Sequence, residues 1–179
     1  MSETPIDSLY NDFKSLSTFL EERKEPSFEL LVNNNSKKII LLAAASFFEF
    51  RFIDDLVSLL QEKSDKKKVI VTFVKNKALN RQFHTLFQWD QKNGANNFFG
   101  LFGDDFKKHI QMKIHQDEEL EKSVQAFLNL GSERNRMVHE NFGSFYLEKS
   151  DEEIYSLYKE SMYFITQFPK ILKEYMENE

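Results

Sequence analysis

The sequence predicts an all-α protein, a bundle of five or more helices that ends in a long C-terminal helix. Two observations indicate this fold class. The 179 residues include only 5 glycines and 3 prolines, so few positions break a helix. Apolar side chains recur three and four residues apart along most of the chain, which is the spacing that gathers them on one face of a helix.

The first half of the chain divides into predicted helices. Residues 5–23 form an amphipathic helix that Pro26 interrupts, and residues 27–32 form a short helix that ends at the turn-prone run 33–36. Residues 37–62 form the longest helix, and its first half is apolar almost all round, as in a buried central helix. The β-branched run 69–74 is compatible with a strand, but we interpret it as a helix because helical patterns surround it. Residues 81–89 are a further amphipathic piece.

The second half contains three more helices. The composition of residues 91–97 predicts a loop. The segment 98–103, rich in Phe and Gly, has two interpretations: its rings pack into the core, or they line a binding cleft or a dimer contact. Asp104 is expected to cap a helix that runs to about residue 114. Asp117 opens a long helix with an acidic first turn, which can break at Gly131-Ser132. Residues 150–153 have the capping-box pattern and begin a last helix that runs to about residue 176.

Size and composition limit the function. The chain is most simply one domain, residues 1–179, with an N-terminal helical extension (1–36) and a core (37–175). Its formal net charge of −5 argues against strong non-specific binding of nucleic acid, but it does not exclude a local basic groove. The absence of cysteine excludes disulfides and thiolate metal sites. No cofactor or metal is expected. Since neither a signal peptide nor a membrane helix is evident, we expect a cytoplasmic protein.

A polar trio interrupts the apolar stripe of the helix that follows Asp117. The stripe comprises Leu120, Val124, Phe127, Leu128, Gly131 and Val138. At about 100° per residue, Asn135 lies near the middle of this stripe, and Arg134 and His139 lie on either side of it. Buried polar groups cost stability unless they are paired, so this exception indicates a functional site.

The three side chains suit chemistry on a phosphate. His139 carries an imidazole, the side chain that most often acts as a general acid or base. Arg134 carries a permanent positive charge on a planar fork that matches a phosphate, and Asn135, one turn before His139, can hold the imidazole or the phosphate. In the alternative interpretation, the three residues have only a structural role and the helix ends at residue 130. Arg134 then pairs with a neighbouring glutamate on a surface turn, Glu133 or Glu140, and His139 acts as a cap.

Residues 134–139, RNRMVH, fit the pattern R-N-x-x-x-H. This resembles the R-x4-6-H signature of HEPN domains (higher eukaryotes and prokaryotes nucleotide-binding). The segment FLNLGSERNRMVHENF, followed by the helix start SDEEIY, is similar to the HEPN branch named after its fusion to RiboL-PSP proteins. The resemblance covers roughly residues 37–175 and implies a HEPN-like helical bundle. Because no RiboL-PSP partner domain is present, it implies a stand-alone version.

The resemblance also implies an activity. HEPN proteins of this kind are metal-independent endoribonucleases, hydrolases that bind RNA and act as homodimers with two motifs facing each other. Arg134, Asn135 and His139 would be catalytic. Ser46 and Glu49 match polar positions opposite the motif, and Glu49 would orient Arg134 through an ion pair. RNA affinity would depend on local lysines, namely Lys66 to Lys68, Lys75, Lys107, Lys108 and Lys113.

The family setting suggests a toxin or a component of antiviral (anti-phage) defence, with a possible regulatory or antitoxin protein as partner and no membrane. Some HEPN toxins carry a tyrosine two residues after the histidine, which a nucleotidyltransferase antitoxin modifies. This chain has Asn141 there, so control by that route is not expected. Two alternatives stay open: a non-catalytic HEPN-type module that binds RNA, a nucleotide or a protein, and a purely structural helical interaction domain.

Overall fold

The computed structural model describes residues 3–64, 68–79, 83–89 and 94–178, and no β-strand occurs among them. The predicted all-α class is therefore confirmed, as is the long C-terminal helix. The elements in chain order are α1 (Pro5–Glu22), α2 (Pro26–Lys63), α3 (Lys68–Val74), a π-helical turn η1 (Lys75–Leu79), α4 (Phe83–Leu86), α5 (Ala95–Gly100), α6 (Asp104–Gln116), α7 (Glu118–His139) and α8 (Asp151–Glu177).

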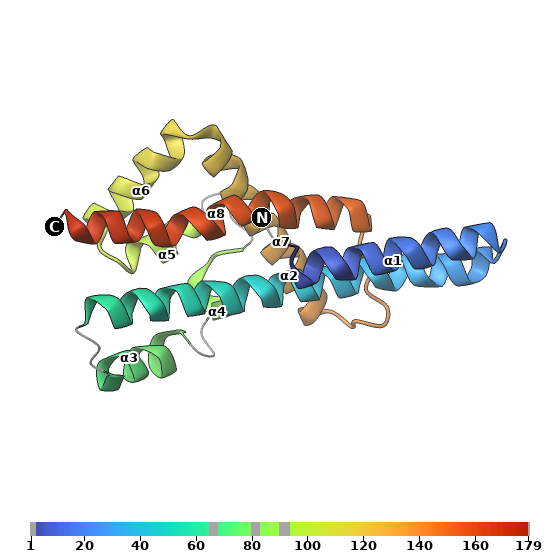
Figure 1. Cartoon of the computed structure of the whole chain (residues 1–179), viewed down its shortest axis with the longest axis horizontal. Coiled ribbons are helices and arrows are strands. Elements are labelled where there is room, and N and C mark those ends of the chain that lie inside the picture. The colour runs from blue at the N-terminus through green and yellow to red at the C-terminus, as the bar shows by residue number, and fades with distance from the viewer. Residues whose placement is uncertain (1–2, 65–67, 80–82, 90–93, 179) are drawn as a thin grey trace.

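Helices α1 and α2 lie side by side as a hairpin that projects from the rest of the molecule (Figure 1). The predicted turn at residues 33–36 is wrong, because α2 continues through it without a break. The polar side chains of this run find partners that a helix permits. The Asn35 amide donates to the Leu31 carbonyl at 2.8 Å, and the Ser17 hydroxyl of α1 donates to the Asn33 side-chain oxygen at 3.1 Å. Such bonds allow turn-forming residues to remain in a helix.

The core lies where α2, α7 and α8 pack together. Aromatic rings fill it at the offset and edge-on distances that such rings prefer. Phe48 of α2 lies 5.8 Å from Phe127 of α7, and Phe52 of α2 lies 5.2 Å from Phe168 of α8, measured between ring centroids. These contacts fix α7 against α2, and α7 carries the R-N-x-x-x-H motif.

The smaller helices partly match the sequence predictions. The run 69–74 is helical as predicted, within α3. Of the expected loop over residues 91–97, residues 91–93 lie outside the described residues, and α5 begins at Ala95. Phe98 and Phe99 in that helix are buried in the core, as one of the two interpretations proposed. Asp104 is not the cap of α6. Gly103 takes that position with φ of 100°, a conformation that glycine adopts without strain. Positions 81 and 82 lie outside the described residues.

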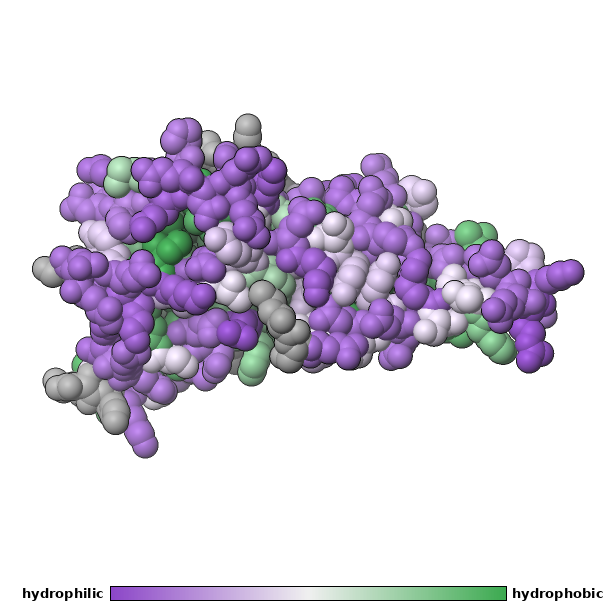
Figure 2. All heavy atoms as spheres, turned by 45° about the horizontal axis from the view of Figure 1, so that its top comes forward, coloured by the Kyte–Doolittle hydropathy of each residue, from purple (hydrophilic) through white to green (hydrophobic). Residues whose placement is uncertain are grey.

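The surface is mostly polar, and apolar side chains appear on it in several places, one of which is the free end of the α1–α2 hairpin (Figure 2). Phe19, Phe28 and Leu30 are among the exposed apolar residues there. In the described part of the chain, no helix has both the length and the apolar character that crossing a membrane requires.

Candidate functional site

Helix α7 presents the motif, and it runs unbroken from Glu118 to His139. Asp117 caps it as predicted, accepting a hydrogen bond from the Leu120 amide at 3.0 Å. That bond, and then one from the Tyr163 hydroxyl, lower the pKa of the Asp117 carboxyl although desolvation opposes them. The predicted break at Gly131-Ser132 is absent. Gly131 serves close packing instead, since a Cβ there would lie 2.0 Å from a ring carbon of Trp89.

The structural alternative for the motif is wrong in its two main features. The helix does not end at residue 130, and Glu133 is not the partner of Arg134. Glu133 instead pairs with Arg136 at 3.2 Å and with Lys149 at 3.4 Å. Among the residues that the structure describes, no carboxylate forms an ion pair with Arg134.

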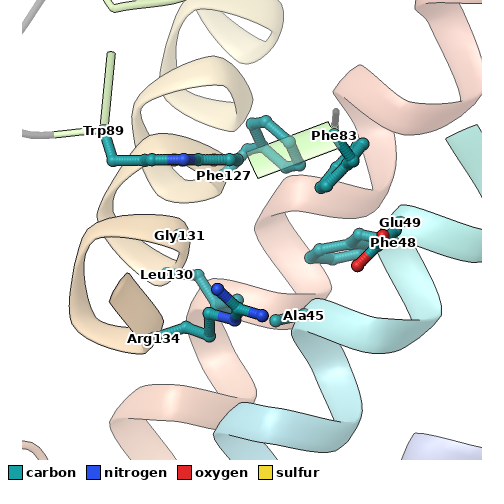
Figure 3. Close-up of a pocket in the computed structure, with 9 residues that line it drawn as sticks. All are labelled: Ala45, Phe48, Glu49, Phe83, Trp89, Phe127, Leu130, Gly131 and Arg134. Carbon is teal, nitrogen blue, oxygen red and sulfur yellow. The ribbon is translucent and has the colours of Figure 1, made fainter. Parts of the chain in front are cut away.

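Arg134 points into a pocket between α2 and α7 (Figure 3). The guanidinium lies beside Ala45 of α2, and aromatic rings form the opposite end of the pocket. Glu49 of α2 lines the same pocket, but the ion pair to Arg134 that the sequence predicted is absent within the single chain. The lining residues are Ala45, Phe48, Glu49, Phe83, Trp89, Phe127, Leu130, Gly131 and Arg134.

The other predicted site residues lie outside this pocket. His139 is exposed at the last position of α7, and Asn135 is partly buried one turn before it. Five helical residues correspond to a rotation of about 140°, so Arg134 and His139 point to different sides of α7. Ser46 is exposed on α2 and does not line the pocket. One chain therefore brings Arg134 and Glu49 together but leaves His139 apart from them.

The family of the chain follows from a match to a protein-family model. The sequence matches the model of RiboL-PSP-HEPN over residues 7–174. The chain belongs to the RiboL-PSP-HEPN family. The matched range includes most of the predicted N-terminal extension as well as the core. No curated protein and no solved structure matches the sequence.

The buried face of the motif helix in this RiboL-PSP-HEPN chain differs from the predicted stripe at its end. Val138 is 44% exposed, whereas Met137 is fully buried. The segment after α7 returns past Glu133 and Arg136. The Phe145 ring lies 5.7 Å from the guanidinium carbon of Arg136, and Lys149 pairs with Glu133 on the same side.

Two lysines of α2 hold the segment that follows the RiboL-PSP-HEPN motif. The Lys38 ammonium donates to the Phe142 carbonyl at 3.0 Å, and the Lys37 ammonium donates to the Leu147 carbonyl at 2.5 Å. Sequence reasoning missed both lysines. The available signal was the position of Lys38, a charged residue at the start of the most apolar part of its helix.

The lysines that the sequence offered for RNA do not gather at the pocket. Lys107, Lys108 and Lys113 lie on α6, whereas Lys68 and Lys75 lie on α3 and η1, at opposite edges of the view in Figure 1. None of these five lines the pocket that contains Arg134. Lys66 and Lys67 lie outside the described residues. Within the described residues, no cluster of three or more His, Asp or Glu side chains has the geometry of a metal site.

Proposed function

We propose that this RiboL-PSP-HEPN protein is a metal-independent endoribonuclease that acts as a homodimer. The observation that carries the proposal is Arg134. It projects from the motif into a pocket, and no carboxylate in the described part of the chain pairs with it. A permanent cation in such a place is suited to an anionic ligand, and a phosphate matches the planar guanidinium fork.

The reaction follows from the three motif residues. The 2′-hydroxyl of RNA attacks the adjacent phosphorus while a base takes its proton. The bond from phosphorus to the 5′-oxygen then breaks as an acid protonates that oxygen. The products are a 2′,3′-cyclic phosphate and a 5′-hydroxyl. His139 acts as the base or the acid, Arg134 stabilises the charge that develops on the phosphoryl oxygens, and Asn135 holds the imidazole or the phosphate.

A second copy of the chain completes the site. The reaction needs two proton transfers, and the motif supplies one histidine, which points away from Arg134 of its own chain. A symmetric dimer provides two histidines and allows His139 of one copy to face Arg134 of the other. We propose that Glu49 orients Arg134 and that Ser46 supports the site once the dimer forms.

An apolar stripe on α2 supports this arrangement. Phe28, Leu31, Ile39 and Phe50 are all exposed, and at about 100° per residue they lie within about 100° of one another on the helix. Glu49 borders the stripe, so a copy of the chain packed on it would lie next to the pocket. Exposed apolar side chains on one side of a helix of 38 residues are typical of an interaction surface.

Dimerisation predicts a direct result. We expect Phe50→Glu, which places a charge on a side chain that is 74% exposed, to convert the dimer to a monomer and to abolish cleavage. Phe73→Glu is the matched control, since Phe73 is 68% exposed on α3 and lies off the stripe. Light scattering at micromolar concentration checks the mass. A wild-type chain that has only the monomer mass of 21.3 kDa would contradict the composite site.

If His139 is the general acid or base, we expect His139→Ala to lower the rate of RNA cleavage by about 10²–10⁴-fold, the usual contribution of such a residue. Because His139 is exposed, its removal should change the free energy of unfolding by less than about 0.5 kcal/mol. The measurement is cleavage of a mixed cellular RNA pool in EDTA, with detection of 2′,3′-cyclic phosphate ends. His115→Ala, an exposed histidine on α6, is the control. Cleavage that survives His139→Ala would reject this residue as the catalyst.

A non-catalytic RNA-binding or nucleotide-binding module is the second candidate. The exposure of His139 favours it, because no hydrogen bond within the described residues orients the imidazole. RNA binding without turnover in the assay above would establish this alternative. A role as a toxin or in anti-phage defence, with a regulatory partner and a cytoplasmic location, is part of the proposal and rests on the family.

A further inference from the structure

Lys38 is a buried cation that has no anionic partner among the described residues. Only 8% of the residue is exposed. Its ammonium donates one hydrogen bond, to the Phe142 carbonyl at 3.0 Å, and lies 5.1 Å from the centre of the Phe142 ring. Across residues 3–64, 68–79, 83–89 and 94–178, no carboxylate pairs with it. Burying a charge without a counter-charge is costly, and two of the three ammonium donors have no acceptor among these contacts.

Lys38 lies on the same face of α2 as the pocket. Residues 38, 45 and 49 fall within about 40° of one another at helical spacing, and the last two line the pocket that contains Arg134. Along the helix, Lys38 is about 10 Å from Ala45, the residue beside the guanidinium. The pocket and Lys38 thus share one side of α2.

The motif helix continues from the pocket toward Lys38. Helix α7 runs antiparallel to α2, since Phe127 meets Phe48 and Phe142, farther along the chain, meets Lys38. Arg134 lies between these two contacts. His139 is three residues before the carbonyl that Lys38 holds. Along α2, the pocket that contains Arg134 is therefore followed by Lys38, a second cation.

We propose that Lys38 binds a backbone phosphate of single-stranded RNA, next to the phosphate held by Arg134. This inference deepens the proposed function and rests on it. RNA brings the negative charge that the described part of the chain does not give Lys38. By holding the Phe142 carbonyl at the same time, Lys38 connects the position of the RNA backbone to the segment directly after His139. It is a positioning residue that carries substrate contacts, in addition to the three residues of the motif.

The salt dependence of RNA binding tests this role. Each phosphate contact on a single strand contributes about 0.7 to the slope of log Kd against log salt. We expect Lys38→Met to reduce that slope by about 0.7 per chain, to weaken binding several-fold at about 0.1 M salt, and to leave the thermal midpoint within a few degrees. Lys38→Gln removes the charge but keeps a hydrogen-bond donor, and it replaces Lys38→Met in the assay if the methionine variant is unstable. Lys38→Arg restores the charge and should restore the slope.

A control variant distinguishes the hydrogen bond from Lys38 to the Phe142 carbonyl from the proposed contact between Lys38 and a phosphate. Lys37→Met is the matched control, because Lys37 also donates to a carbonyl of the segment after α7 but lies on another side of α2. All variants carry His139→Ala to prevent cleavage. The probe is a fluorescein-labelled, mixed-sequence RNA of roughly 12 nucleotides, followed by anisotropy.

Each outcome decides the proposal. A slope that falls with Lys38→Met and Lys38→Gln, but not with Lys37→Met or Lys38→Arg, supports it. An unchanged slope in a folded Lys38 variant overturns it and leaves Lys38 as a structural tether, while the proposed function stands. An equal fall for Lys37→Met also overturns it, since the effect would then be general. A protein without any RNA affinity overturns the inference together with the proposed function.

Discussion

Gly131→Ala is expected to lower the free energy of unfolding by about 2 kcal/mol, although alanine normally strengthens a helix. An added Cβ would lie 2.0 and 2.1 Å from two ring carbons of Trp89, far inside contact distance. The ring cannot move freely, because it packs 4.9 Å from Phe87 and 5.5 Å from Phe127 between centroids. Overpacking of this kind typically costs about 1–3 kcal/mol, which exceeds the gain of roughly 1 kcal/mol in helix propensity.

The measurement is urea unfolding followed by the emission of Trp89, the only tryptophan in the chain. Gly100→Ala is the matched control, because a Cβ there meets only the Lys107 side chain at 3.9 Å, and we expect no loss of stability. Combining Gly131→Ala with Trp89→Leu should recover most of the loss, since the coupling energy of a double-mutant cycle reports the clash. Strictly additive effects would show that the ring is not the cause.

Sequence patterns predicted most helices because their signals are local. Asp117 at the start of α7 and the Ser150–Glu153 capping box at the start of α8 both form as predicted. Periodicity also identified the two longest core helices, although α2 begins earlier than expected. These features depend on residues within one or two turns of each other. Local patterns therefore located the starts of α7 and α8 and the end of α8 well.

The errors occur where distant residues decide the local structure. The run 33–36 has the composition of a turn, but Ser17 of α1 binds Asn33 and α2 stays intact. Gly131 has the composition of a break, but it is the place where Trp89, 42 positions earlier in the sequence, approaches the helix. Val138 fits the apolar stripe, but it is exposed, and its neighbour Met137 is buried in its place. No local pattern contains this information.

The candidate site likewise contains residues that the sequence predicted and residues that it did not. The sequence singled out Arg134 and Glu49, which lie 85 positions apart, and the structure places them in one pocket. The resemblance to HEPN domains made this possible, because spacing alone does not relate two helices. The aromatic end of the pocket at Trp89 and the buried ammonium of Lys38 were not predicted. Both depend on how α2 packs against α7, which a single sequence does not specify.

Asp7→Asn is expected to destabilise the protein by about 2 kcal/mol at neutral pH, because one buried carboxylate joins α1 to α8. Asp7 is 7% exposed. It accepts hydrogen bonds from the Tyr155 hydroxyl at 2.7 Å, from the Lys159 ammonium at 3.1 Å and from the Thr4 amide at 2.8 Å. Bonds to a charged acceptor contribute about 1.5–3 kcal/mol each in favourable cases, and the exposure of Lys159 reduces its share.

The pH dependence identifies the carboxylate as the cause. Burial by itself would raise the pKa of Asp7, but the bonds from Thr4, Tyr155 and Lys159 outweigh it and hold the pKa well below its usual value. The hydrogen bond to Asp7, more than burial, raises the pKa of Tyr155 to about 12. A carboxyl whose pKa is lower in the folded state stabilises the fold only while it is ionised. Its contribution is therefore complete above about pH 4, the ordinary value for aspartate, and decreases as the pH falls below it.

Urea unfolding of wild type and Asp7→Asn between about pH 2 and pH 7 should show a gap in unfolding free energy that is constant from neutral pH down to about pH 5 and narrows at lower pH. Asp12→Asn is the control, since Asp12 is exposed on the same helix and should show little difference at any pH. A gap that keeps its full size at about pH 2 would mean that the asparagine disturbs packing, not charge. A narrowing gap would establish that the link between α1 and α8 is electrostatic, and that the hairpin docks through the N-terminal turn of α1.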